Sequence, residues 1–152
     1  MKVYRIAKTK YINDLSGAGA KLHGGRWNHI GHGIIYTSES RALATVEYVV
    51  HIPISLLPTD CSVATIEITS GIIPEQILPS DLPSNWSSIP PPIELAELGT
   101  VWALKNNSLL LRVPSAAVAG DFNILINTLH PDMKHVTISN IEKYEYDERL
   151  FK

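Results

Sequence analysis

The sequence predicts a single α/β domain of short strands with a few helices, and three observations support this. The chain has 152 residues, which suits one hydrophobic core. Its 45% hydrophobic and 18% charged residues are an ordinary globular balance, so disorder is not expected. Short apolar runs of strand length are interspersed with segments that repeat at the helical period. We therefore expect residues 1–152 to form one domain.

The first three elements are predicted to be two strands and a helix. Residues 3–7 and 34–38 have the composition of strands, and the second is almost wholly apolar, which indicates a central place in the sheet. Over residues 39–51 the apolar side chains return to one helical face. Ser38 is the expected N-cap of that helix, and Pro53 prevents it from continuing.

A strand and a long irregular segment follow. Residues 61–69 are predicted to be a strand, at the start of which Cys61 is expected to be a buried thiol. Residues 74–92 hold six of the ten prolines, which is incompatible with regular structure. As a linker this segment would leave flanks of about 70 and 60 residues, each marginal as an independent domain. We therefore expect an ordered surface loop, with Trp86 packed against the domain.

The last part of the chain is predicted to hold a second helix and several strands. Residues 92–105 can form a helix, whose middle Gly99 weakens. Residues 122–129 are ambiguous. Further strands are expected over residues 109–113, 136–139 and 143–146. Core positions are expected for Trp27, Trp86 and Trp102.

Charge and hydropathy exclude several classes of protein. A formal net charge of −2 and a pI of about 6.3 do not give the basic surface of a nucleic-acid binder or the lysine-rich patch of a membrane-surface protein. No apolar run approaches the roughly 18 residues that cross a bilayer, and the first residues lack the apolar stretch of a signal peptide. We expect a cytoplasmic protein that binds neither nucleic acid nor membrane directly.

Three familiar chemistries fit the sequence poorly. Residues 17–22 begin like a dinucleotide-binding fingerprint, but Leu22 stands where its third glycine belongs. The six histidines include no H-E-x-x-H pair and there is one cysteine, so no metal site is expected. Ser115 lacks the flanking glycines of a nucleophile elbow, which argues against a serine hydrolase.

The most informative stretch is Gly24-Gly25-Arg26-Trp27-Asn28, which is followed by Tyr36 and Glu47 near the ends of the next two elements. Glycines ahead of an arginine let a ligand approach the backbone closely, and the planar fork of Arg26 matches a phosphate or carboxylate. At 100° per residue, Glu47 lies about 100° from the centre of its helix's apolar face, where a carboxylate can line a cleft. A phosphate-bearing ligand is the first expectation.

Taken in order, these motifs resemble the RES-domain toxins of bacterial toxin–antitoxin pairs. The resemblance extends over nearly the whole chain. Besides the Arg26 segment it includes Tyr4-Arg5-Ile6, Ser16-Gly17, Gly19-Ala20, Leu22, Tyr36-Thr37, Glu47, residues 63–68, Asp81-Leu82-Pro83 with Trp86, Leu98-Gly99 with Trp102, Arg112-Val113-Pro114-Ser115-Ala116, Asn123, Asn127 and His130-Pro131-Asp132.

The resemblance implies a fold similar to ADP-ribosyltransferase toxins, NAD as a substrate with no separate cofactor, and a cognate Xre-type antitoxin that occludes the site in a hetero-oligomer. Carried over by position, it implies catalytic roles for Glu47, Arg26, Tyr36 and Ser115. Substrate contacts would come from Arg26, Tyr36, Asn28 and Ser115. One departure is the loop over residues 29–33, where family members often have a proline.

The chemistry of NAD suits these side chains. Its nicotinamide leaves as a neutral base, so breaking the ribosyl bond requires no general acid, only stabilisation of an oxocarbenium-like centre. Glu47 could provide that charge and accept a hydrogen bond from the 2′-hydroxyl. Arg26 would hold the diphosphate, Tyr36 would offer its ring and hydroxyl to the nicotinamide ribose, and Ser115 would lie beside them.

Three functions stay open at the level of sequence. The first is hydrolysis or phosphorolysis of free NAD, which would deplete the cell and arrest growth. The second is transfer of ADP-ribose onto a protein, and the third is a non-catalytic cleft that receives an antitoxin segment. Thr45 favours the first, because many arginine-directed transferases have glutamate or glutamine two residues before the catalytic glutamate. We expect Asn123, Asn127 and His130 to fix loop structure.

Overall fold

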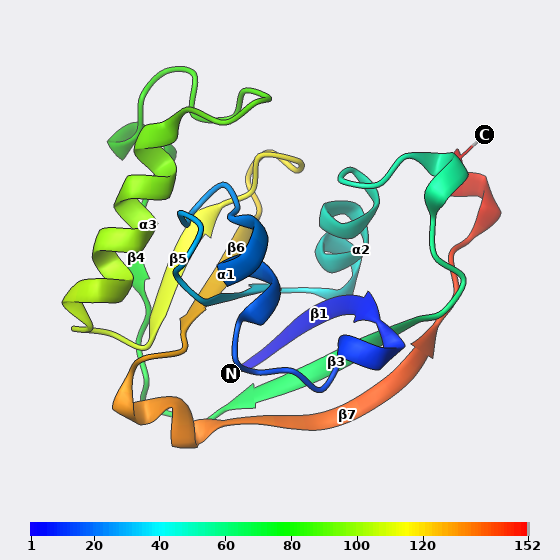
Figure 1. Ribbon diagram of the computed structural model, residues 1–152, viewed down its shortest axis with the longest axis horizontal. Coiled ribbons are helices and arrows are strands. Elements are labelled where there is room, and N and C mark those ends of the chain that lie inside the picture. Colours follow the sequence, from blue (N-terminus) through cyan, green and yellow to red (C-terminus); the bar gives the residue numbers. More distant parts are fainter. Residues whose placement is uncertain (152) are drawn as a thin grey trace.

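The computed structural model describes residues 1–151 and has one seven-stranded sheet (Figure 1). In chain order the strands are β1 (Lys2–Lys8), β2 (Ile34–Ser38), β3 (Cys61–Ile68), β4 (Glu75–Gln76), β5 (Leu110–Pro114), β6 (Phe122–Asn127) and β7 (Val136–Tyr144). Their order across the sheet is β4-β5-β6-β2-β1-β3-β7. Neighbouring strands are antiparallel except for β4 and β5. The predicted central place of β2 is confirmed, and the α/β fold class with it.

Three α-helices cover parts of the sheet. They are α1 (Ala18–His23), α2 (Arg41–Val49) and α3 (Ile93–Lys105). Helix α2 packs on β1 and β2, and α1 on β2, whereas α3 lies beside β4 and β5 at the end of the sheet remote from β7 (Figure 1). Single 3-10 turns occur at η1 (Thr9–Tyr11), η2 (Ile54–Leu56), η3 (Pro79–Asp81), η4 (Pro131–His135) and η5 (Glu148–Phe151). None of the helices in the described part of the chain is long and apolar enough to cross a membrane.

The expected N-cap of α2 is wrong by two residues. Ser40 is the cap, and its hydroxyl accepts a hydrogen bond from the backbone N–H of Leu43 at 3.0 Å. Ser38 is still part of β2, where it pairs with Tyr4 on one side and Asn123 on the other. The helix is therefore shorter at both ends than the apolar pattern predicts.

The closing strands were expected as two, and the structure has one. Strand β7 runs unbroken over Val136–Tyr144, and the ambiguous segment before it is strand β6. The register between β3 and β7 shifts at Thr65/Ile66. A bulge of this kind inserts an extra residue and reverses which side chains face the core, which is why the sequence pattern suggested a break. Helix α1 was not predicted, because none of its residues is buried.

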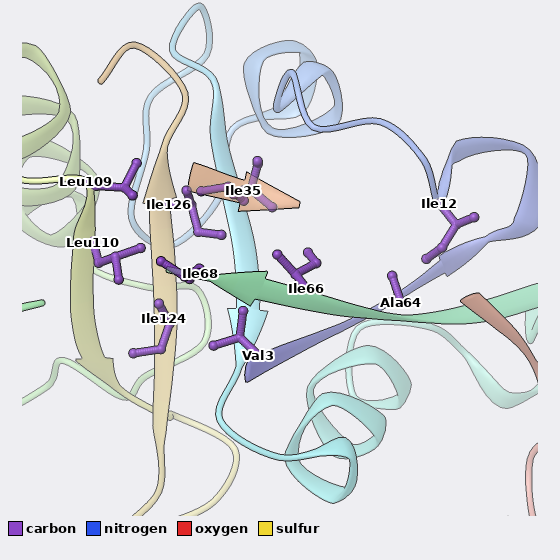
Figure 2. Packing of buried hydrophobic residues seen from close by; sticks show 11 residues of the cluster. Val3, Ile12, Ile35, Ala64, Ile66, Ile68, Leu109, Leu110, Ile124 and Ile126 are labelled. Carbon is purple, nitrogen blue, oxygen red and sulfur yellow. The ribbon is translucent and has the colours of Figure 1, made fainter. Parts of the chain in front are cut away.

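The largest cluster of buried side chains joins both halves of the sheet. Figure 2 shows it to consist of Val3, Ile12, Ile35, Ala64, Ile66, Ile68, Leu109, Leu110, Ile124 and Ile126, with Val136 also a member. Each large aliphatic side chain that leaves water contributes roughly 1.5–3 kcal/mol. These contacts make β1, β2, β3 and β6 one rigid platform.

The proline-rich segment is ordered, as expected, but it is not wholly irregular, because it contains β4 and η3. The Ile77 N–H donates to the carbonyl of Arg112 at 2.9 Å, which extends the pairing of β4 with β5. Trp86 packs against a second cluster that contains Trp27, Trp102 and Leu95. The expected core position is thus confirmed for Trp27 and Trp102, and Trp86 is partly buried beside them. Cys61 is fully buried, also as expected.

Candidate active site

A cleft of about 550 Å³ opens where three neighbouring strands have their ends. Strand β6 lies between β5 and β2 and is antiparallel to both, so its first residues lie beside the last residues of those strands. Helix α2 follows β2 directly and provides another wall. The loop between α1 and β2 completes the enclosure. Three of the expected site residues, Arg26, Tyr36 and Glu47, line this cleft. A fourth, Ser115, lies behind Glu47 and bonds to it.

Glu47 projects from α2 into the cleft with a side chain that is 22% exposed. Its Oε1 accepts two hydrogen bonds, from the Ser115 hydroxyl at 2.7 Å and from the Asn123 amide nitrogen at 2.5 Å. His51, one turn further along, places its Nε2 3.9 Å from the other oxygen, Oε2. Glu47 is thus fixed on one side and accessible on the other.

Ser115 holds Glu47 from behind. It follows β5 directly and is 3% exposed. Its hydroxyl oxygen accepts hydrogen bonds from the N–H groups of Ala117 and Val118, at 3.1 and 2.9 Å, so its single hydrogen is directed at Glu47. Contrary to the expectation from the sequence, Ser115 therefore has no group free for a substrate in this arrangement.

Arg26 lies in the loop between α1 and β2 and lines the cleft. Its Nη1 donates to the carbonyls of Trp86 at 2.7 Å and Ser88 at 3.2 Å, and Nη2 donates to Ser88 at 3.2 Å. These three bonds leave Nε–H and one Nη2 hydrogen, which form one edge of the guanidinium fork. Burial lowers the pKa of Arg26 and the charge of Glu47 opposes that change, and a guanidinium stays protonated in proteins.

The side chain of Tyr36 is oriented by hydrogen bonds to the loop that carries Arg26. Its hydroxyl accepts from the Trp27 N–H at 3.0 Å and donates to Asn28 Oδ1 at 2.7 Å. A Cβ at Gly25 would lie 2.6 Å from that hydroxyl oxygen, so the close approach requires glycine. Burial raises the pKa of Tyr36, which keeps the phenol neutral. With its hydroxyl already bonded, Tyr36 offers the cleft its ring rather than the expected hydroxyl.

Asn28 is 1% exposed and does not reach the cleft. Besides accepting from Tyr36, it donates through Nδ2 to the carbonyls of Ala20, His29 and His32, at 2.8, 3.1 and 3.0 Å. Its side chain therefore fixes the loop over residues 29–33 and orients Tyr36. The expected substrate contact through Asn28 is not present, because all its polar atoms are bonded inside the protein.

The close contact between α3 and the loop that carries Arg26 explains why residue 99 is a glycine. A Cβ at Gly99 would lie 1.9 Å from the carbonyl oxygen of Trp27. The N–H of His29 also donates to the Thr100 hydroxyl, at 3.0 Å. Gly99 has a weak helix propensity, as the sequence indicates, but its missing side chain is what lets the Arg26 loop pack on α3.

The whole sequence has recognisable relatives among known proteins. The model of the RES domain matches residues 2–147. The chain belongs to the RES domain family. It is accordingly a toxin of a toxin–antitoxin system.

Relatives of this RES domain protein match over nearly its whole length. "Prs ADP-ribosylating toxin" of Sphingobium sp. (strain YBL2) is 39% identical over 96% of this chain and 92% of its own. "Toxin Res" of Yersinia enterocolitica is 37% identical over 99% of both chains. A chain in the crystal structure of the M. tuberculosis MbcT–MbcA toxin–antitoxin complex superposes with a TM-score of 0.72 at 17% identity, covering 94% of this chain and 83% of that one. That likeness shows a shared fold.

Asn123 is a further residue of the RES domain whose place differs from the expectation. It was expected to fix loop structure, yet it lines the cleft and bonds directly to Glu47. Asn127 is fully buried and bonds to Ala103 and Asn106, and His130 accepts from the N–H of Asp132 at the start of η4. These two have the structural roles that were expected. Asn123 lies near the start of β6, next to the end of β2. Only the pairing of these two strands would have indicated its place in the cleft.

No metal-binding cluster accompanies the cleft. Within residues 1–151, no three His, Cys, Asp or Glu side chains are grouped closely enough to hold a metal ion. Among the groups that line the cleft are the Oε2 atom of Glu47, the free guanidinium edge of Arg26 and the ring of Tyr36. The cleft can bind an anion and stabilise a positive charge within the same space.

Proposed function

We propose that the cleft binds NAD and that the protein cleaves its nicotinamide–ribose bond, which depletes cellular NAD and arrests growth. One observation carries the proposal: Glu47 is held through Oε1 by two donors while Oε2 accepts no hydrogen bond from residues 1–151. A carboxylate in that state is suited to an oxocarbenium-like ribose, because preorganised charge stabilises a transition state without reorganisation. The volume of the cleft is within the usual range for small-molecule sites.

Each cleft residue then has a separate task. The free edge of Arg26 would bind a diphosphate oxygen pair in bidentate fashion, since its other edge is occupied by the carbonyls of Trp86 and Ser88. The ring of Tyr36 would pack against the nicotinamide ribose. Oε2 of Glu47 would accept from the 2′-hydroxyl, a bond that strengthens as the ribose gains charge. The nicotinamide leaves as a neutral base and takes the electron pair of the broken bond.

The acceptor of the ADP-ribosyl group distinguishes two versions of this reaction. Water would give ADP-ribose, and phosphate would give its 1″-phosphate. A protein side chain as acceptor is the second candidate, and the relative whose name is "Prs ADP-ribosylating toxin" favours it. Thr45 favours water or phosphate, because many arginine-directed transferases have glutamate or glutamine at that place. Its hydroxyl bonds instead to the Arg41 carbonyl and the Tyr144 hydroxyl.

The test begins in cells and continues with purified protein. Induced expression without antitoxin should stop growth and lower NAD, whereas Glu47→Gln should do neither. Glu75→Gln, an exposed change on β4, is the matched control and should act like the parent. Incubation with NAD, with and without phosphate and with cell extract, then separates ADP-ribose, its 1″-phosphate and labelled protein. Growth arrest with unchanged NAD and no labelled protein would refute NAD use and leave the non-catalytic alternative.

We also propose that a cognate Xre-type antitoxin closes the cleft in a hetero-oligomer. The toxin–antitoxin complex among the structural neighbours supports a protein partner. The polar groups around the cleft mouth, Arg26 and the Oε2 atom of Glu47, are suited to a segment that brings a carboxylate or an amide. Calorimetry with NAD is the test: the free protein should bind it and the purified complex should not. Equal binding by both would show that control does not act through occlusion.

A further inference from the structure

The arginines of the chain fall into two groups. Three form ion pairs with carboxylates: Arg41 with Glu142, Arg112 with Glu39, and Arg149 with Asp147. The other two, Arg5 and Arg26, have no ion-pair partner within residues 1–151, and they are also the two that line the cleft. Because a partly buried charge is usually paired, a cleft with two unpaired guanidinium groups suits a ligand with two negative charges.

Arg5 lies where two strands of the sheet separate. Strands β1 and β2 share one pair of residues, Tyr4 with Ser38, and Arg5 is the next residue of β1. On its other side β1 is paired with β3 along its whole length. Arg5 therefore lines the cleft from a strand that is fixed in the sheet, whereas Arg26 lines it from the loop before β2. The two guanidinium groups reach the same cleft from separate elements.

The guanidinium of Arg5 has donors that the protein does not use. Its Nη1 donates to the carbonyl of Asp14, which is its single hydrogen bond within residues 1–151. Every buried side-chain nitrogen and oxygen in that part of the chain has a partner, so the unbonded Nε and Nη2 of Arg5 are open to solvent. Their hydrogens form one edge of the planar fork, and that edge matches two oxygens of a phosphate.

The carboxylate of Asp14 does not occupy this edge. It accepts hydrogen bonds from the backbone N–H and the hydroxyl of Ser16 and forms no ion pair with Arg5. Burial lowers the pKa of both cleft arginines, and the charge that opposes this change is Glu47 at Arg26 and Asp14 at Arg5. Glu47 thus acts on Arg26 and not on Arg5, which places Arg5 further from the carboxylate.

We propose that Arg5 is a second phosphate-binding residue of the cleft, which binds the phosphate on the adenosine side of NAD while Arg26 binds the one on the nicotinamide side. Glu47 would face the nicotinamide ribose, so the arginine close to it takes the nearer phosphate. A dinucleotide is then held by both arginines and a mononucleotide by one, which selects for the dinucleotide. The assignment of the two phosphates rests on the proposed function, but phosphate binding by Arg5 does not.

Two mononucleotides separate the roles of the two arginines. Adenosine monophosphate has the adenosine-side phosphate alone, and nicotinamide mononucleotide has the other. Their dissociation constants are measured by NMR titration in proteins that all carry Glu47→Gln, so that no ligand is consumed. Arg5→Met removes the charge and keeps most of the length of the side chain, and Arg26→Met is the reciprocal variant. Arg149→Met is the matched control, because it removes the same charge from an exposed ion pair outside the cleft.

The expected pattern is reciprocal. Arg5→Met should weaken the binding of adenosine monophosphate about tenfold or more, because hydrogen bonds between charged groups are strong, and should change that of nicotinamide mononucleotide little. Arg26→Met should do the reverse, and Arg149→Met should change neither. Equal weakening of both ligands by Arg5→Met would show that Arg5 only supports the cleft through Asp14, and would overturn the proposal. Unchanged or absent binding of adenosine monophosphate would overturn it too.

A second variant covers the case in which Arg5→Met does not fold. Arg5→Lys keeps the charge and a donor for the Asp14 carbonyl but has no planar fork. It should fold and still weaken adenosine monophosphate more than nicotinamide mononucleotide. Equal effects on the two ligands would again overturn the proposal.

Turnover distinguishes a failure of this proposal from a failure of the proposed function. With Glu47 intact, Arg5→Met should raise KM for NAD about tenfold and change kcat little, because the contact exists in the ground state. An unchanged KM in active protein would overturn the role of Arg5 in binding NAD. Parent protein that consumes no NAD refutes the proposed function instead, and the titration with adenosine monophosphate still decides whether Arg5 binds a phosphate.

Discussion

Replacing Glu47 by glutamine should abolish most of the activity without unfolding the protein. The amide oxygen of glutamine can take the place of Oε1 and accept from both Ser115 and Asn123. The amide nitrogen then lies where Oε2 is now. The variant keeps the shape of the cleft and its internal hydrogen bonds, and it loses one negative charge and one acceptor.

The size of the effect follows from the position of that charge. Two unit charges 4 Å apart interact with about 4 kcal/mol at the effective dielectric constant typical near a protein surface, and a side chain that is 22% exposed is in such an environment. Because an oxocarbenium-like centre carries less than a full charge, we expect a loss of about 3–4 kcal/mol. That corresponds to a fall in turnover by a factor of order 10² to 10³.

The assay is NAD consumption at saturating NAD, with product identified by chromatography. The Michaelis constant should change little, because the charge acts mainly in the transition state. Thermal unfolding of the variant and the parent is measured in parallel, since Glu47 lies at the border of the buried face of α2. A folded Glu47→Gln protein that consumes NAD at the parent rate would refute the assignment of Glu47 as the catalytic carboxylate.

Three further predictions concern other residues. Arg26→Ala should raise the apparent Michaelis constant for NAD about tenfold or more, with a smaller effect on kcat, because the diphosphate contact exists in the ground state; an unchanged constant would contradict this. Gly99→Ala should lower the free energy of unfolding in urea by about 1–3 kcal/mol, because its methyl group would meet the Trp27 carbonyl, whereas Gly19→Ala, with no atom within 4 Å of the added carbon, should not. Because burial raises the pKa of Tyr36, its contribution to stability is complete below pH of about 10 and is lost as the pH rises further; urea unfolding at pH 8 and pH 11 should show a smaller loss for Tyr36→Phe than for the parent.

Elements whose own residues show a strand or helix pattern were predicted correctly from the sequence. The apolar run of β2 and the helical period of α2 and α3 identified those elements, and the glycines before Arg26 indicated a close approach. Helix α1 was missed because it buries no residue and so has no apolar period. The break expected within β7 lies next to a bulge in that same strand, where Ser139 has no partner between Ile138 and Asn140. A bulge interrupts the alternation of a strand without ending it, so the pattern alone does not distinguish one bulged strand from two strands.

The site was predictable only in part for a similar reason. Arg26 and Glu47 were identified from their own surroundings in the chain. Asn123 lies beside Glu47, 76 positions away in sequence, because it pairs with Ser38 in the sheet. The burial of Asn28 depends on which carbonyls the loop brings to it. Residues that act through other residues need the pairing of strands before their partners are known.

The order of the strands has a consequence for how the protein is made. Tyr36 and Glu47 belong to β2 and α2, early in the chain, whereas Ser115 and Asn123 lie at the adjoining ends of β5 and β6, near its end. A nascent chain that stops before residue 115 has a carboxylate with neither of its donors, and its central strand β2 lacks β6, one of its two neighbours. The cleft is therefore completed only when translation is nearly finished, so truncated chains should be harmless to the cell that makes them.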